Sequence, residues 1–202
     1  MREDNSWLLD AGQIDLFRMR NHINHELWLD FSRSPYYHDS EPNSVNGCHV
    51  RLVELFVNDE YRGLYSLMEP IDRKQLKLKK YKKGVKGALW KAFSWDHVPF
   101  NTAISDYDNT SATCYGFEAK YPEPGDDADT TDYKPLVDAV NFVVGSTDED
   151  FRLHINEYID MPVFKDYVIF INLINGIDNV AKNCYWSVYD ETKDRKITIT
   201  PW

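Results

Sequence analysis

Two β-prone runs joined by a short polar turn constrain the fold of this 202-residue chain more than any other feature. The runs cover residues 48–57 and 64–69, and the segment between them, residues 58–63, includes Asn, Asp and Gly. This pattern favours a β-hairpin, and Pro70 ends the second run because proline donates no ladder hydrogen bond. We therefore expect an antiparallel hairpin in the first half of the chain.

The last third of the chain combines helical periodicity with a second pair of β-prone runs. Apolar residues at helical spacing predict helices around residues 136–145, 151–158 and 161–175. Residues 185–189 and 196–200 alternate as strands do and predict a second hairpin. Helices combined with antiparallel hairpins indicate an α+β fold.

A further helix is predicted near the start of the chain, where apolar residues keep helical spacing over residues 14–31. Asp10 or Asp15 is placed to cap its start. His22 and His25 lie three residues apart on this helix, a spacing that allows two ligands of one metal ion. Because no third ligand lies near them in the sequence, we expect ordinary surface histidines.

Charge and composition exclude several functional classes. The net charge of −10 argues against sequence-independent nucleic-acid binding, which needs a basic surface. No apolar stretch approaches the roughly 18 residues of a membrane span, and residues 1–5 do not resemble a signal peptide. The three cysteines are far apart and show no metal-binding or disulfide spacing.

The strongest chemical signal is the spacing Asp-x-x-x-x-Asn between Asp178 and Asn183, which follows the helix predicted over residues 161–175. Phosphoryl transfer needs a carboxylate that orients the attacking hydroxyl and accepts its proton, and oxygen ligands for Mg²⁺. Lys182 inside the loop would balance charge on the transferring phosphate. The alternative is an ordinary turn, since Asp and Asn favour turns, and the spacing alone does not decide between the two.

Several segments resemble the CotH family, whose members are similar to spore coat protein H and have an atypical protein-kinase fold. The most specific segment is residues 55–72, with the sequence LFVNDEYRGLYSLMEPID, in which two strands enclose Asn-x-x-Tyr-x-Gly-Leu-Tyr. Residues 7–21, 115–122 and 178–185 are also similar to the family. The resemblance therefore extends over nearly the whole chain.

This resemblance implies phosphorylation of protein Ser or Thr hydroxyls, with ATP and Mg²⁺ or Mn²⁺ as cofactors. It makes Asp178 the catalytic base and Asn183 a metal ligand. Glu69 and Asp72 are expected to bind the cofactor, because residues 69–72 correspond to the hinge near the adenine. For Glu69, a carboxylate that caps a turn at the end of a strand is an equal alternative.

The kinase-like fold predicts two parts. Residues 1–93 are expected to form a partial N-lobe with a helix, a hairpin and a basic stretch. Residues 94–202 are expected to form a mostly helical C-lobe that begins with a long irregular insertion, residues 94–132, with a short strand at residues 117–121. Residues 88–93 predict another short strand.

Both ends of the chain adjoin sequence that looks structured, and we expect a fragment truncated at both ends. Family members carry a lysine that contacts ATP phosphates before the position of Trp7, and a second metal-binding Asp after the position of Trp202. Neither lies within these 202 residues, so we expect this piece alone to be inactive.

A second hypothesis keeps the same fold without catalysis, as a cell-surface binding or adhesion module. The kinase hypothesis predicts a protein substrate as partner, and neither hypothesis includes nucleic acid. The resemblance places the protein at the cell envelope or outside the cell.

Overall fold

The computed structural model describes residues 6–95, 100–126 and 128–202, which form two antiparallel sheets and four α-helices. The smaller sheet has the strand order β1-β3-β2, with β1 at Leu8–Asp10, β2 at Val50–Val57 and β3 at Glu60–Met68. The larger sheet has the order β5-β6-β4-β7-β8, with β5 at Thr113–Cys114, β6 at Phe117–Tyr121, β4 at Ala88–Ala92, β7 at Cys184–Asp190 and β8 at Asp194–Pro201. All neighbouring strands run antiparallel, so the predicted α+β class is confirmed.

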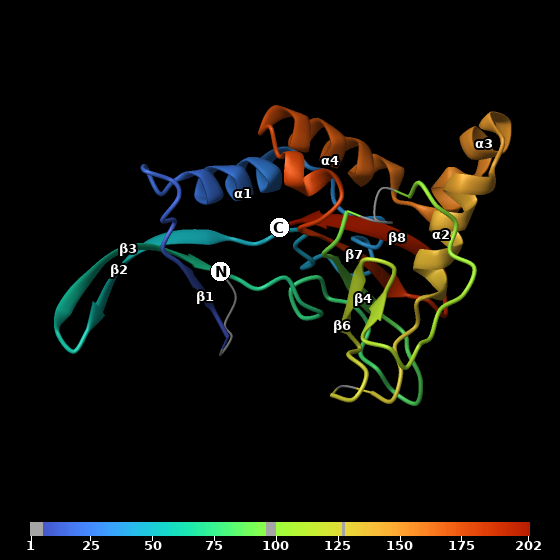
Figure 1. Ribbon diagram of the computed structural model, residues 1–202, viewed down its shortest axis with the longest axis horizontal. Helices are drawn as coiled ribbons and strands as arrows, with labels where there is room; N and C mark the ends of the chain where they lie inside the picture. Colours follow the sequence, from blue (N-terminus) through green and yellow to red (C-terminus); the bar gives the residue numbers. More distant parts are fainter. Residues whose placement is uncertain (1–5, 96–99, 127) are drawn as a thin grey trace.

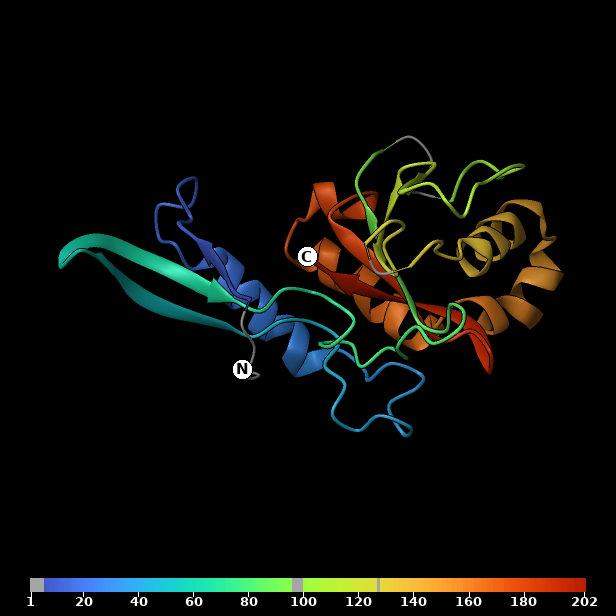
Figure 2. The ribbon, with the colours of Figure 1, turned by 90° about the horizontal axis from the view of Figure 1, so that it is seen from below.

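The hairpin of β2 and β3 is present as predicted and extends from the rest of the molecule as an arm (Figure 1). Asn58 and Asp59 at its tip have φ angles of 51° and 66°. Asn and Asp tolerate this left-handed region better than most residues, which suits a two-residue hairpin turn. The view from below shows the arm projecting at one end of the molecule, with α2 and α3 at the other (Figure 2).

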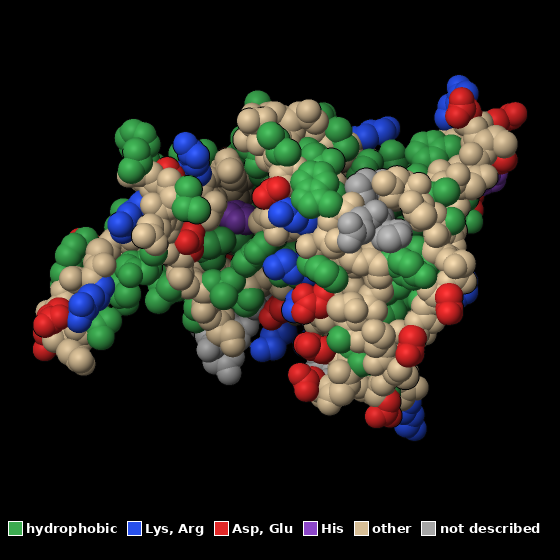
Figure 3. Space-filling view, in the orientation of Figure 1, with side chains coloured by type: hydrophobic (Ala, Val, Ile, Leu, Met, Phe, Trp, Pro, Cys, Tyr) green, Lys and Arg blue, Asp and Glu red, His purple; other side chains and the backbone are tan. Residues whose placement is uncertain are grey.

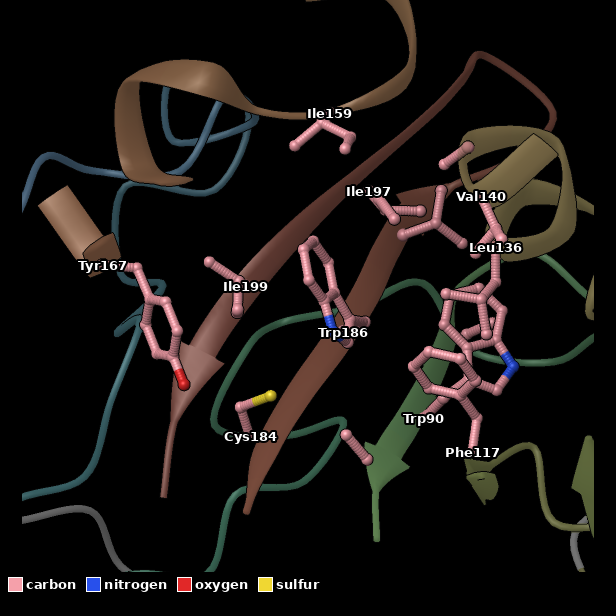
Figure 4. Packing of buried hydrophobic residues seen from close by; sticks show 14 of the residues in the cluster. Trp90, Phe117, Leu136, Val140, Ile159, Tyr167, Cys184, Trp186, Ile197 and Ile199 are labelled. Carbon is pink, nitrogen blue, oxygen red and sulfur yellow. The ribbon is translucent and has the colours of Figure 1, made fainter. Parts of the chain in front are cut away.

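The larger sheet forms the centre of the molecule, with α2 at Lys134–Gly145, α3 at Asp148–Tyr158 and α4 at Met161–Leu173 packed against it. Trp90, Trp186 and Ile197 of the sheet form one core with Leu136 and Val140 of α2 (Figure 4). Alternate residues on the same strands, such as Leu89 and Tyr185, belong to a second buried cluster. Both faces of the central strands are therefore covered, which explains why every residue of β7 is buried.

The first helix is shorter than the predicted one, because α1 begins at Arg20 and ends at Phe31. Arg18 has a φ of 55°, which a continuous right-handed helix does not allow. Asp15 accepts hydrogen bonds at 2.8 Å from the N–H groups of Met19 and Arg20, so it satisfies donors at the start of α1. The periodicity upstream of Arg20 was misleading, and Leu16 there is 94% exposed.

Some sequence predictions concern regions that the structure describes only partly. Residues 1–5, where no signal peptide was recognised, lie outside the described residues, as do residues 96–99 of the insertion. No helix among the described residues is long and apolar enough to cross a membrane. The larger sheet pairs β4 with strands that come after residue 93, and the division into lobes at that residue stays a prediction.

Candidate functional site

The loop between α4 and β7 carries three of the predicted site residues. After α4, Asn175 has a φ of 54°, and the N–H of Gly176 donates to the Ile171 carbonyl at 2.8 Å. A left-handed residue just beyond the last turn ends a helix by directing the chain away from its axis. The 3₁₀ turn η1, Ile177–Val180, then leads towards β7.

Asp178 presents its carboxylate to solvent, with 62% of its side chain exposed. Nζ of Lys182 lies 3.6 Å from Oδ1 of Asp178, and the N–H of Lys182 donates to the Asp178 carbonyl at 3.1 Å. An exposed ion pair at this distance adds little to stability. The Asp178 carboxylate is therefore accessible to a hydroxyl group that approaches from solvent.

Asn183 ends the loop in a left-handed conformation, with a φ of 56°. Its N–H donates to the carbonyl of Ala92 at 2.9 Å, at the end of β4 where the pairing with β7 begins. This bond ties the end of the loop to a central strand of the larger sheet. Asp178, Lys182 and Asn183, which we call the loop cluster, thus lie together on one short segment.

Glu69 lies just beyond β3 and is almost completely buried, with 1% exposure. Its Oε2 accepts a hydrogen bond from the N–H of His49 at 3.0 Å and from Nε2 of Gln75 at 3.0 Å. Nδ1 of His49 lies 2.9 Å from the same oxygen. The carboxylate is therefore surrounded by protein donors rather than by solvent.

Asp72 shares a partner with Glu69. Oδ1 of Asp72 accepts a hydrogen bond at 2.7 Å from the N–H of Gln75, whose side chain also donates to the Gly47 carbonyl at 2.9 Å. We call Glu69, Asp72, His49 and Gln75 the strand-end cluster. These bonds fix the path of the chain after β3, as expected for carboxylates that cap a turn.

His25 and Trp202 lie between the two clusters. Nδ1 of His25 is 3.4 Å from Sγ of Cys48, and its ring centroid is 6.5 Å from that of Trp202, whose carbonyl accepts a bond from Asn179. The prediction that His25 is a surface residue is wrong: it is 8% exposed. Burial, with a smaller contribution from nearby His22, lowers the pKa of His25 to about 4.

The loop cluster contains two side chains with oxygen atoms that could bind a metal ion. Within the described part of the chain, no group of three or more His, Cys, Asp or Glu side chains could hold a metal ion. Asp178 and Asn183 offer one carboxylate and one amide oxygen. Mg²⁺ in nucleotide sites is commonly held by one or two carboxylates together with phosphates and water. These oxygens are of the kinds that Mg²⁺ prefers, and phosphates or water would have to supply the other ligands.

Three residues that hydrogen-bond within or beside the two clusters were not predicted from the sequence. Asn179 adjoins Asp178 but has the composition of a turn, and its two side-chain hydrogen bonds could not be predicted from that. His49 and Gln75 meet around Glu69 although His49 is 20 residues away from it in the chain. Only the repeated occurrence of polar residues next to the predicted strand ends could have indicated them.

Charged side chains of both signs lie around the larger sheet on the side that faces the arm, and also on the arm itself (Figure 3).

A family model described as "CotH kinase protein" matches residues 1–202, which is the whole chain. No curated protein matches it. The family match spans both the strand-end cluster and the loop cluster.

Proposed function

The chain belongs to the CotH kinase family, and from this membership we propose that the protein transfers the γ-phosphoryl group of ATP to Ser or Thr hydroxyls of a protein substrate. One observation carries the proposal: the exposed Asp178 carboxylate shares a short loop with Lys182 and Asn183. Phosphoryl transfer requires positioning and electrostatic stabilisation more than covalent chemistry, and these three side chains are of the types needed.

In the proposed reaction, Asp178 accepts a hydrogen bond from the substrate hydroxyl and then takes its proton on a carboxylate oxygen. The exposure of the Asp178 carboxylate supports this role, because a general base must reach the hydroxyl directly. Lys182 places a positive charge 3.6 Å from that carboxylate, where it would offset negative charge during transfer.

When bound, ATP with Mg²⁺ or Mn²⁺ supplies the phosphoryl group, and Asn183 would hold the metal ion through its amide oxygen. We propose that residues 69–72 lie beside the nucleotide. Because the carboxylates of Glu69 and Asp72 already accept hydrogen bonds from protein groups, we assign nucleotide contact in this segment to its backbone. The two carboxylates would hold that backbone in place.

The test compares Asp178→Asn with Asp138→Asn in the protein as it is encoded. Asp138 is a matched control, because its carboxylate pairs with Lys134 at 2.7 Å at the same i,i+4 spacing on a helix. Transfer of labelled phosphate from ATP to casein or to the protein itself is measured with Mg²⁺ and with Mn²⁺. We expect Asp178→Asn to lose about a hundredfold or more of the rate and Asp138→Asn to keep it.

Equal rates in the wild type and Asp178→Asn would contradict the proposal. The competing function is a non-catalytic surface-binding module, and exposed apolar side chains on the arm, such as Phe56 and Tyr61, favour it. A wild-type protein that neither binds Mn²⁺–ATP in calorimetry nor transfers phosphate would support that alternative. We place either function at the cell envelope or outside the cell, which fractionation of the cells that make the protein would test.

A further inference from the structure

The side chain of Asn179 bridges two segments that are distant in the chain. Its Nδ2 donates to the carbonyl of Asn183 at 3.1 Å and to the carbonyl of Trp202 at 2.9 Å. The first acceptor belongs to Asn183, the last residue of the loop cluster. The second belongs to Trp202, which follows the last residue of β8. A single amide nitrogen has two hydrogens, so one side chain can serve both acceptors.

The backbone of Asn179 is itself held by a helix. The hydroxyl of Tyr167, on α4, donates to the Asn179 carbonyl, and Tyr167 is 2% exposed. The base of the bridge is therefore fixed to the buried side of α4. From there the Asn179 amide reaches across the loop to Asn183 and to the end of the larger sheet.

The bridge also fixes the backbone of Asn183. Asn183 has a φ of 56°, a left-handed conformation that Asn adopts more readily than most residues other than glycine. Its N–H is bonded to Ala92 and its carbonyl to Asn179, so both backbone groups of Asn183 are fixed. The fixed backbone sets the direction of the Cα–Cβ bond of Asn183, from which its side chain extends.

We propose that Asn179 is a positioning residue that sets the direction of Asn183 and locks the loop cluster to the end of β8. This inference rests on the proposed function, in which Asn183 binds the metal ion. Asn179 would touch neither the nucleotide nor the substrate. Its effect would pass through the two backbone carbonyls that it holds.

The first test is independent of catalysis. Asn179→Asp keeps the shape of the side chain but replaces its donor with a carboxylate that repels both carbonyls. Asn172→Asp is the matched control, because Asn172 on α4 also donates from its amide to a backbone carbonyl, that of Val168 at 2.7 Å. Hydrogen exchange followed by mass spectrometry reports the protection of residues 178–183 in the protein as it is encoded.

We expect exchange of residues 178–183 to accelerate at least tenfold in Asn179→Asp and to stay unchanged in Asn172→Asp. Tyr167→Phe removes only the hydroxyl that holds the Asn179 carbonyl, so it should produce a smaller change in the same residues. Equal exchange in Asn179→Asp and the wild type would overturn the inference, whatever the protein catalyses.

The second test asks whether the bridge positions the metal ligand. In the protein as it is encoded, we expect Asn179→Asp to raise the Mn²⁺ concentration for half-maximal transfer about tenfold, while the KM for ATP at saturating Mn²⁺ stays the same. Faster exchange with an unchanged Mn²⁺ requirement would overturn the positioning role. An inactive wild type would overturn the proposed function and the metal-positioning role together, whereas an active wild type with unaffected Asp178→Asn would overturn only the role of Asp178.

Discussion

The strand-end cluster and the loop cluster treat their carboxylates in opposite ways. Glu69 is 1% exposed and accepts hydrogen bonds from His49 and Gln75. Asp178 has 62% of its side chain exposed and lies 3.6 Å from Nζ of Lys182. A buried carboxylate with several donors stabilises structure, whereas an exposed one is available for chemistry. The two acidic residues therefore differ in their surroundings, and on the proposed function this separates a structural carboxylate from a catalytic one.

The comparison predicts its largest effect for Asp178→Asn, on rate and not on folding. Its transfer rate should fall by roughly 10²- to 10⁴-fold, the range for loss of a general base, which corresponds to about 3 to 5 kcal/mol of barrier. Its free energy of unfolding in urea should stay within about 0.5 kcal/mol of the wild type, because the ion pair is exposed. A large loss of stability in Asp178→Asn would show that Asp178, like Glu69, is a structural carboxylate.

Glu69→Ala should show the reverse pattern, with a loss of stability. The N–H of His49 and the amide of Gln75 would lose a buried acceptor, and we expect the free energy of unfolding to fall by about 2 to 4 kcal/mol. The control is Glu60→Ala on the arm, where the carboxylate is 70% exposed and pairs with Arg62 at 2.6 Å. That change should cost no more than about 0.5 kcal/mol. Similar losses for the two variants would show that Glu69 is not a structural carboxylate.

His25, between the clusters, should make the protein sensitive to acid. Its pKa is about 4 in the folded protein and about 6.5 when unfolded, so the unfolded state binds more protons between these values. The free energy of unfolding should therefore be highest above about pH 6.5, where His25 is neutral in both states. It should fall by about 2 to 3 kcal/mol as the pH drops towards 4. Urea titrations at several pH values measure this fall.

His25→Gln should remove most of that pH dependence. His154→Gln is the control, because His154 on α3 is exposed and lies 2.8 Å from Glu157, which raises its pKa. A raised histidine pKa adds stability at low pH that is lost as the pH rises, so His154 acts with the opposite sign. If the acid sensitivity persisted unchanged in His25→Gln, its source would lie elsewhere in the molecule.

Lys182→Met should give the smallest effect and sharpen the role of charge in the loop cluster. The transfer rate should fall about tenfold, since a partly exposed ammonium stabilises developing charge less than a buried one. Stability should again stay within about 0.5 kcal/mol. Lys134→Met on α2 is the control and should leave the rate unchanged. A rate loss as large as that of Asp178→Asn would mean that Lys182 contacts the transferring group directly.

The sequence alone determined the local elements of this protein. Both hairpins, the three helices between residues 134 and 173 and the loop with Asp178 and Asn183 were predicted from periodicity and turn residues. Such signals depend on residues only a few positions apart, so they can be recognised without knowledge of any tertiary contact. The first helix was too long because its apolar spacing gave no sign of the left-handed Arg18.

Tertiary structure alone decided which polar groups are buried and which are accessible. Glu69 meets His49 across 20 residues, Asn179 meets Trp202 across 23, and Arg33 meets Asp166 across 133. The free energy of a buried polar group depends on the donors that packing brings to it, and sequence spacing does not specify those donors. For that reason the sequence left Glu69 open between a nucleotide contact and a turn cap, and only the packed structure shows its carboxylate buried among protein donors.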